Sequence, residues 1–159
     1  MSSPGPEELR SLVSRYPSGV CIVTVDAGGQ KLGLTVGSLV TLSLEPPLVG
    51  FAIRRDAALH ELLREAGAFG VSLLAGGQDA LAQHFARGVP PIGMWHGIAT
   101  EEGARGAPLL VGALGWLECR TAAEHETGDH SFFVGEVEAV RLGEPAPPLV
   151  YHDGSYRAL

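Results

Sequence analysis

The stretch Gly33-Leu34-Thr35-Val36-Gly37-Ser38 is followed, after one leucine, by Val40-Thr41-Leu42-Ser43-Leu44. Aliphatic and β-branched residues predominate, as they do in a strand, but two glycines and two serines interrupt them. Residues 32–43 therefore predict a strand that bends or passes close to a ligand, because glycine weakens an ordinary strand interior. Residues 20–25 and 48–53, on either side, are apolar on both alternating faces, which predicts two deeply buried strands.

Short apolar runs between turns continue along the rest of the chain. Further strands are predicted at residues 69–74, 109–120, 131–142 and 149–152, which makes about seven strands in all. Helical periodicity is found at residues 7–15, 57–66 and 78–86. Asp56 is expected to cap the second of these helices and Gly67 to end it. The sequence thus predicts a mainly β fold with a few short helices.

Length and composition indicate an ordinary globular protein. The 159 residues suit a single domain, 1–159, and 45% hydrophobic against 18% charged residues argues against disorder. No apolar run reaches the roughly 18 residues of a membrane span, and residues 1–10 do not resemble a secretory signal, so we expect a cytoplasmic protein. Cys21 and Cys119 lie in apolar runs, as buried thiols do. A net charge of −7 disfavours nucleic acid and anionic membranes as partners.

Several familiar catalytic motifs are missing from the sequence. No G-x-G-x-x-G follows a predicted strand and no G-x-x-x-x-G-K-[ST] occurs, so neither a Rossmann unit nor a P-loop is expected. The histidines and acidic residues at 124–130 match no zinc spacing, and no metal site is predicted. There is no G-x-S-x-G elbow, and neither cysteine lies in an electropositive setting, so nucleophilic catalysis lacks support. We therefore expect a bound cofactor to supply the chemistry.

Five runs join residues 33–48 in one ordered pattern: Tyr16-Pro17-Ser18-Gly19-Val20, Phe69-Gly70-Val71-Ser72-Leu73-Leu74, Gly112-Ala113-Leu114-Gly115-Trp116-Leu117-Glu118-Cys119, Gly128-Asp129-His130 and Pro148-Leu149-Val150-Tyr151-His152. In order and spacing, this pattern resembles the flavin reductase-like domain family. The resemblance implies a dimeric, FMN-binding split β-barrel that reduces FMN, or FAD as a diffusing substrate, with NADH or NADPH. It also implies a partner monooxygenase that receives the reduced flavin.

Two alternatives stay open at this point. A non-enzymatic split barrel could bind flavin or deazaflavin as a carrier or sensor, and would then be a yellow protein inert to both nicotinamides. A barrel similar to pyridoxamine-phosphate oxidases would instead oxidise a phosphate-ester amine.

The resemblance also implies which residues contact the cofactor. By this resemblance, the flavin contacts are assigned to hydroxyls and backbone groups within residues 33–44 and to two aromatic residues further along the chain. These residues are Thr35, Val36, Gly37, Ser38, Ser43, Leu44, Phe85 and Tyr156. His130, the one predicted catalytic residue, is placed beside flavin and nicotinamide. A neutral imidazole there can donate one hydrogen bond to a carboxamide or a flavin carbonyl. Hydride transfer needs no protein acid or base, so orientation is expected to supply the rate.

Arg54 and Arg55 end a buried strand just before a predicted helix, so two guanidiniums meet the positive N-terminus of that helix. They predict a phosphate-binding site, to which Asp56 and a further cation, Arg87, are also assigned. The sequence departs from the family here, since Asp56-Ala57-Ala58 replaces Ser or Thr hydroxyls and an inward carboxylate would repel phosphate.

Two further departures concern the approach to the ring. Gly37 replaces the first of a pair of serines, and Pro90-Pro91-Ile92-Gly93-Met94-Trp95 replaces a more polar loop. We expect residues 88–97, which are rich in Gly and Pro, to form a loop over the site.

Overall fold

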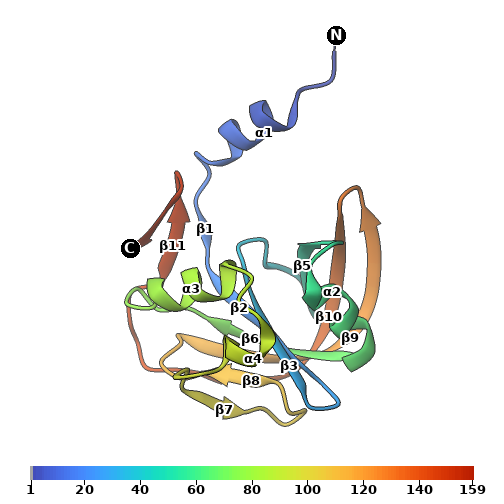
Figure 1. Ribbon diagram of the computed structural model, residues 1–159, viewed down its shortest axis with the longest axis vertical. Helices are drawn as coiled ribbons and strands as arrows, with labels where there is room; N and C mark the ends of the chain where they lie inside the picture. The colour runs from blue at the N-terminus through green and yellow to red at the C-terminus, as the bar shows by residue number, and fades with distance from the viewer. Residues whose placement is uncertain (1) are drawn as a thin grey trace.

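The computed structural model describes residues 2–159. Its main element is an antiparallel sheet with the strand order β3-β2-β6-β9-β10-β5-β4 (Figure 1). Its seven strands are β2 (Cys21–Ala27), β3 (Gln30–Val36), β4 (Val40–Leu44), β5 (Pro47–Arg54), β6 (Ala68–Leu73), β9 (Gly115–Thr127) and β10 (His130–Leu142).

Two smaller sheets and four helices surround this sheet. The small sheets comprise β1 (Ser18–Gly19), β11 (Leu149–His152) and β12 (Ser155–Ala158) in one, and β7 (Thr100–Glu102) and β8 (Pro108–Leu110) in the other. The helices are α1 (Pro6–Val13), α2 (Ala58–Ala66), α3 (Asp79–Ala86) and α4 (Pro91–Met94). Figure 1 shows α1 projecting away from the body of the protein. Within residues 2–159, none of the helices has the length and apolar character that crossing a membrane demands.

The edge strands of the large sheet, β3 and β4, are consecutive in the chain. Residues 37–39 alone join them. Four Cα steps span at most about 14 Å, because an extended chain advances no more than about 3.6 Å per residue. The edges of a flat seven-stranded sheet would lie roughly 29 Å apart at about 4.8 Å per strand. The sheet must therefore curl until its edges approach, which makes a barrel with a seam between β3 and β4.

Ser38, in the connection that crosses this seam, is fixed to β5 through its side chain. The backbone pairing of β4 with β5 reaches only as far as Val40 opposite Gly50. Beyond that point the Ser38 hydroxyl accepts a hydrogen bond from the backbone N–H of Ala52 at 2.9 Å and donates one to its carbonyl at 3.0 Å. One hydroxyl thus pairs both backbone groups that a longer β4 would have paired.

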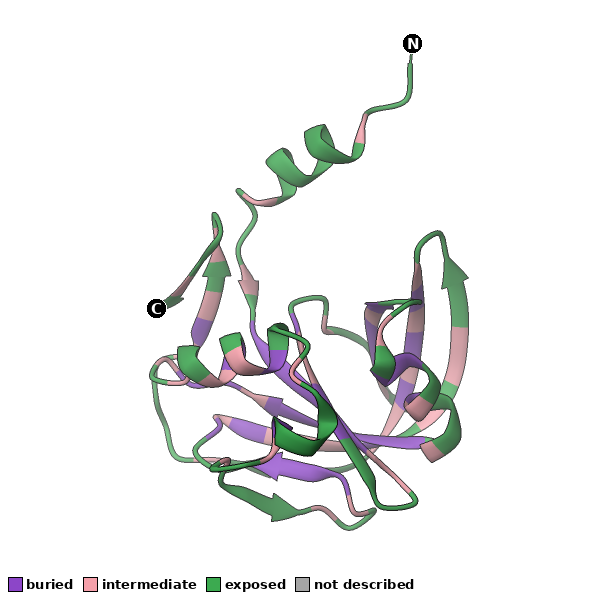
Figure 2. Cartoon of the chain, in the orientation of Figure 1, coloured by how far each residue is buried: buried purple, intermediate pink, exposed green. Residues whose placement is uncertain are grey.

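The core inside the curl is built on three buried phenylalanines from strands β5, β6 and β10. Phe51 lies edge-on to Phe69 with ring centroids 5.1 Å apart, and stacks on Phe133 at 5.9 Å. Such aromatic pairs add about 0.5–1.5 kcal/mol each beyond the burial of their area. Figure 2 shows buried segments along the strands of the barrel and an exposed α1.

The strand predictions agree with the structure in five cases and fail in two. Strands β2, β5, β6, β10 and β11 lie within two residues of the predicted bounds. The single strand predicted at 32–43 is wrong, because Gly37 and Ser38 carry the chain from one edge of the sheet to the other. The strand predicted at 109–120 is also wrong, because Gly112, with φ of 85°, turns the chain between β8 and β9. The predicted total of about seven is too low, since short strands such as β7 and β12 were missed.

The predicted ends of helix α2 are half correct. Gly67 ends the helix in the left-handed region at φ of 64°, as expected. The N-cap, however, is Ala57, with no capping hydrogen bond from a side chain, so the prediction of Asp56 as the cap is wrong. The Asp56 carboxylate instead accepts two hydrogen bonds from the guanidinium of Arg54. A charge-assisted bidentate pair is stronger than a bond to one backbone N–H, which accounts for the difference.

Candidate functional site

Some of the predicted cofactor residues gather in two groups. The first group, which we call the hydroxyl end and which includes the adjoining Ser38, surrounds a cavity of about 180 Å³. It is lined by Ser18, Val20, Thr35, Gly37, Ala86, Tyr151 and Tyr156. Three predicted residues, Thr35, Gly37 and Tyr156, are therefore brought together by the fold.

Local hydrogen bonding and packing fix the hydroxyl end. The hydroxyl of Thr35 donates to the carbonyl of Ala82 at 2.6 Å, which ties β3 to α3. At Gly37 a Cβ atom would lie only 2.9 Å from the hydroxyl of Ser18, so glycine here leaves room for that serine. The rings of Tyr151 and Tyr156 lie 5.1 Å apart. Desolvation raises the pKa of Tyr156, which keeps its phenol neutral.

The second group, the charged end, is built where β5 meets the start of β10. His130 lies opposite Arg54 in the strand register, and the backbone N–H of Arg55 donates to the carbonyl of Asp129 at 3.0 Å. A cavity of about 460 Å³ at this end is lined by Arg54, Arg55, Asp56, His60, Glu61, Arg64, Gly128 and Asp129. The fold thus brings residues 54–56 beside the predicted catalytic histidine.

Each predicted cation at the charged end is already paired with a carboxylate. The guanidinium of Arg54 donates to both oxygens of Asp56, at 3.0 and 3.1 Å, and this lowers the pKa of the Asp56 carboxyl. Arg55 donates to Glu126 on strand β9. The local excess of positive charge that was predicted for a phosphate site is therefore neutralised.

His130 is half-exposed and is oriented by its neighbour. Its Nδ1 lies 2.6 Å from a carboxylate oxygen of Asp129, and this contact lowers the pKa of Asp129. Since an ionised carboxylate only accepts hydrogen bonds, Nδ1 carries the proton and the neutral ring offers Nε2 as an acceptor. The sequence-based expectation of a hydrogen-bond donor is therefore revised to an acceptor.

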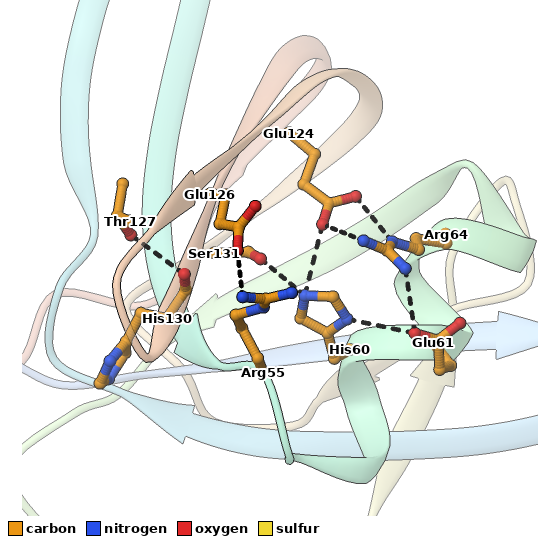
Figure 3. A network of polar contacts seen from close by, with 9 residues as sticks. All are labelled: Arg55, His60, Glu61, Arg64, Glu124, Glu126, Thr127, His130 and Ser131. Carbon is orange, nitrogen blue, oxygen red and sulfur yellow. Dashed lines mark hydrogen bonds and ion pairs between the residues drawn. The ribbon is translucent and has the colours of Figure 1, made fainter.

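Sequence reasoning missed a polar network beside the charged end. In Figure 3 the buried imidazole of His60 lies between Ser131, Glu124 and Glu61, with Arg64 next to it, while the ring of His130 points away. His60 Nε2 is 2.7 Å from the hydroxyl of Ser131, and Arg64 donates to both oxygens of Glu124 at 2.8 and 2.7 Å. One sequence signal could have indicated that His60 is buried: it lies one turn before Leu63, on the apolar face of the helix.

Other predicted cofactor residues lie outside both cavities. Val36 and Phe85 are buried in the core. Ser43 and Leu44 lie at the hairpin end of β4, opposite Leu48 and Pro47. Arg87 follows α3, and its guanidinium reaches only Gln83, at 3.4 Å. None of these five residues lines either of the two cavities.

The segment 88–97 does not form the simple loop that was predicted, because it contains α4. It packs against β3, where the indole N–H of Trp95 donates to the carbonyl of Lys31 at 2.9 Å. With the β2–β3 turn and α2 it lines a cavity of about 570 Å³. None of the predicted cofactor residues, all of which are described, lines that cavity.

A family model described as "Flavin reductase like domain" matches residues 13–159. The chain belongs to this family. The reductase component of 4-hydroxyphenylacetate 3-monooxygenase from Thermus thermophilus is 45% identical to this flavin reductase-like protein over 153 residues, which cover 96% of each chain.

Solved structures resemble the flavin reductase-like protein over its whole length. The flavin reductase component of a bacterial two-component tryptophan halogenase has a TM-score of 0.91 at 39% identity, covering 98% of both chains. The NADH:FAD oxidoreductase of Streptomyces globisporus, solved with NAD and FAD fragments, has a TM-score of 0.91 at 32% identity, covering 100% of this chain and 97% of its own. These comparisons confirm the predicted split-barrel fold and the predicted flavin reductase class.

Proposed function

We propose that this flavin reductase-like protein reduces FMN or FAD with NADH or NADPH at the end of strand β5. The observation that carries the proposal is the meeting of two other segments with the end of this strand. Ser38 bonds to Ala52, Arg54 follows two residues later, and His130 lies opposite Arg54. Polar groups that converge in this way on one strand end are typical of a site that orients a planar cofactor.

In this proposal the protein binds and orients, while the cofactor supplies the redox chemistry. A bound flavin accepts a hydride, which is a proton with two electrons, from the reduced nicotinamide. The Thr35–Ser38 stretch and Tyr156 would hold the ring system, and Gly37 leaves room for the Ser18 hydroxyl beside it. Residues 54–56 lie toward the ribityl end. The rate then depends on keeping donor and acceptor close together and water out.

His130 serves in this proposal as the catalytic residue that touches the nicotinamide. Its Nε2, left as an acceptor by the bond between Nδ1 and Asp129, suits the amide N–H of a carboxamide. Such a bond fixes the face and tilt of the nicotinamide ring, and orientation is the contribution that hydride transfer requires of a protein.

The proposal includes a homodimer. The hydroxyl-end cavity of about 180 Å³ is smaller than the roughly 300–1,000 Å³ of most small-molecule sites, so one chain does not enclose a flavin. Helix α1 buries no residue in its own chain and exposes Leu9, Leu12 and Val13. The edge strand β4 exposes Val40 and Leu44 as well. A second copy that covers these apolar side chains would also add walls to the site.

Three further expectations belong to the same proposal. We propose that reduced flavin passes to a partner monooxygenase, as the names of the relatives suggest. We propose one domain for residues 1–159, which is supported by a family match to residues 13–159. We propose cytoplasmic residence, which agrees with two free, buried cysteines, both of whose pKa values burial raises to about 12.

Anaerobic mixing of the purified protein with NADH or NADPH and each flavin tests the proposal. We expect catalytic bleaching of FMN or FAD with stoichiometric loss of reduced nicotinamide. A protein that binds flavin but leaves it oxidised with both nicotinamides would contradict the proposal and favour a carrier. Steady-state kinetics over the four cofactor pairs would then assign the preferred pair.

A further inference from the structure

The largest of the three cavities described above, of about 570 Å³, lies between α2, the segment that contains α4, and the turn from β2 to β3. Its volume falls within the roughly 300–1,000 Å³ of most small-molecule sites. Its wall is mainly apolar and includes Leu32, Leu62, Pro91, Ile92 and Trp95. No predicted cofactor residue within residues 2–159 lines it, so the proposed flavin site does not account for this cavity.

The indole of Trp95 is fixed in this wall by contacts on two sides. Its N–H donates to the carbonyl of Lys31 at 2.9 Å, and its ring packs against Phe85 with the ring centroids 5.1 Å apart. The preceding residue is fixed as well, because the thioether of Met94 accepts a hydrogen bond from the backbone N–H of Gly33 at 3.3 Å. The ring is therefore held in place before any ligand arrives, which lowers the cost of ordering it on binding.

Lys31, whose carbonyl holds the indole, is the only lysine of the chain and lines the same cavity. Asp26 lies opposite it in the strand register, but that carboxylate accepts a hydrogen bond from the backbone N–H of Gly29 at 2.7 Å. Within residues 2–159, no carboxylate oxygen lies within 4.0 Å of the ammonium nitrogen. The acidic residue of the lining, Glu61, is bonded to Arg64 at 3.1 Å. The lining thus holds one cation without a carboxylate partner.

A fixed indole and an unpaired ammonium in one cavity suit a planar aromatic group that carries an anion. An aromatic ring gains from packing on an indole and from leaving water for the apolar wall. The ammonium of Lys31 attracts an anion as a compact point charge, so it accepts either a phosphate or a carboxylate. This local attraction is needed because the whole chain carries a net charge of −7.

We propose that this cavity is a binding site for a planar aromatic ring that bears a phosphate or a carboxylate. The ring packs on Trp95 and the acidic group lies at Lys31. Two sources share this chemistry, namely the adenosine-phosphate half of a dinucleotide and a free aromatic acid. Since the lining contains none of the predicted flavin residues, the inference does not depend on the proposed function.

The single lysine allows binding to be measured at the site itself. Reductive methylation with ¹³C-formaldehyde labels Lys31 and the terminal amine, and methylated lysine keeps its charge. Titration of the whole protein with 5′-AMP and with 2-naphthoate should shift the Lys31 signal, with a Kd below about 1 mM for at least one of them. Adenosine and 2-naphthamide, which lack the charge, should bind about two- to fivefold more weakly. A response to 5′-AMP alone supports the dinucleotide source, and a response to 2-naphthoate alone supports a free aromatic acid.

Substitutions at exposed positions test the placement of each group, with calorimetry as the measurement. Lys31→Gln, which retains the carbonyl that holds Trp95, should abolish the advantage of each anion over its uncharged counterpart. Arg157→Gln, at an exposed cation outside the cavity, is the matched control. Ile92→Asp, at a side chain that is 99% exposed, should weaken anion binding by about five- to tenfold, whereas Leu142→Asp, at one that is 86% exposed and outside the cavity, should not. Melting curves confirm that each variant is folded.

Three results would overturn the inference and leave the proposed function intact. The first is a Lys31 signal that stays still up to about 10 mM of both anions. The second is an equal effect of Lys31→Gln and Arg157→Gln on anion binding. The third is loss of binding when FMN saturates the protein, because the anions would then occupy the flavin site. Conversely, a protein that binds either anion at Lys31 but reduces no flavin would support the inference and contradict the proposed function.

Discussion

The hydroxyl end and the charged end of the site are held in different ways. At the hydroxyl end, Thr35 and Ser38 bond to backbone groups of neighbouring elements, so their positions follow from the barrel itself. At the charged end, Arg54 and Arg55 bond to exposed carboxylates, which another anion or water can replace. The difference indicates that the hydroxyl end is preorganised, whereas the charged end depends on a balance of exchangeable ion pairs.

His60 is the exception at the charged end, because it is buried and anchors α2 to β10 through Ser131. We expect His60→Ala to lower the free energy of unfolding by about 2–4 kcal/mol, since it leaves a cavity and an unpaired hydroxyl. Urea unfolding measures this, with His125→Ala, an exposed histidine of β9, as the matched control. If both variants lose the same small free energy of unfolding, His60 does not anchor the charged end.

His130→Ala tests whether the charged end orients the nicotinamide. We expect kcat/KM for the nicotinamide to fall by about ten- to hundredfold while flavin affinity stays within about threefold, because orientation is lost but the flavin cradle is not. Stopped-flow reduction of prebound flavin separates the two effects. Loss of flavin binding with an unchanged hydride-transfer rate would show that His130 binds the flavin and does not orient the nicotinamide. His125→Ala again serves as the control.

Ser38→Ala tests the preorganisation of the hydroxyl end. Both backbone groups of Ala52 on β5 lose their partner, and we expect the free energy of unfolding to fall by about 1 kcal/mol. Thermal unfolding measures the loss. Ser38→Thr, which retains a hydroxyl, should restore most of it, and Ser11→Ala on the exposed helix α1 should have little effect. Equal stability of Ser38→Ala and Ser11→Ala would show that the bonds between Ser38 and Ala52 do not stabilise the fold.

Among these variants, removing an ion pair at the charged end should have the smallest effect on stability. That effect should also depend on pH. Arg64 lowers the folded-state pKa of Glu124 below its ordinary value of 4.5. The pair therefore stabilises the fold above that ordinary value, and the stabilisation is lost as pH falls through the lower folded pKa. Glu124→Gln should reduce Tm slightly at neutral pH, and the difference should shrink as pH falls below 4.5 and close below the lowered folded-state pKa. A difference that persists in acid would assign the loss to packing rather than charge.

The two ends also differ in how far the sequence predicts them. Short apolar runs and glycines are local signals, so most strands could be placed from the sequence, although the break between β3 and β4 at residues 37–39 was not. The partners at the charged end could not, because Arg55 and Glu126 are 71 residues apart and Arg64 and Glu124 are 60 apart. No periodicity encodes such pairs. The error at Asp56 has a different cause, because Arg54 is only two residues away and the choice between a helix cap and Arg54 depends on side-chain geometry.

The Ser38 hydroxyl gives the barrel a joint that moves faster than the strands around it. Separating two paired strands breaks several backbone hydrogen bonds in concert, but a rotation about χ1 of Ser38 releases both bonds to Ala52 at once. Exposed side chains rotate in picoseconds to nanoseconds, whereas strands separate by local unfolding, which is far slower. This end of the pairing between β4 and β5 can therefore open without loss of the sheet. Hydrogen exchange at the single amide of Ala52 would report the fraction of time that it is open.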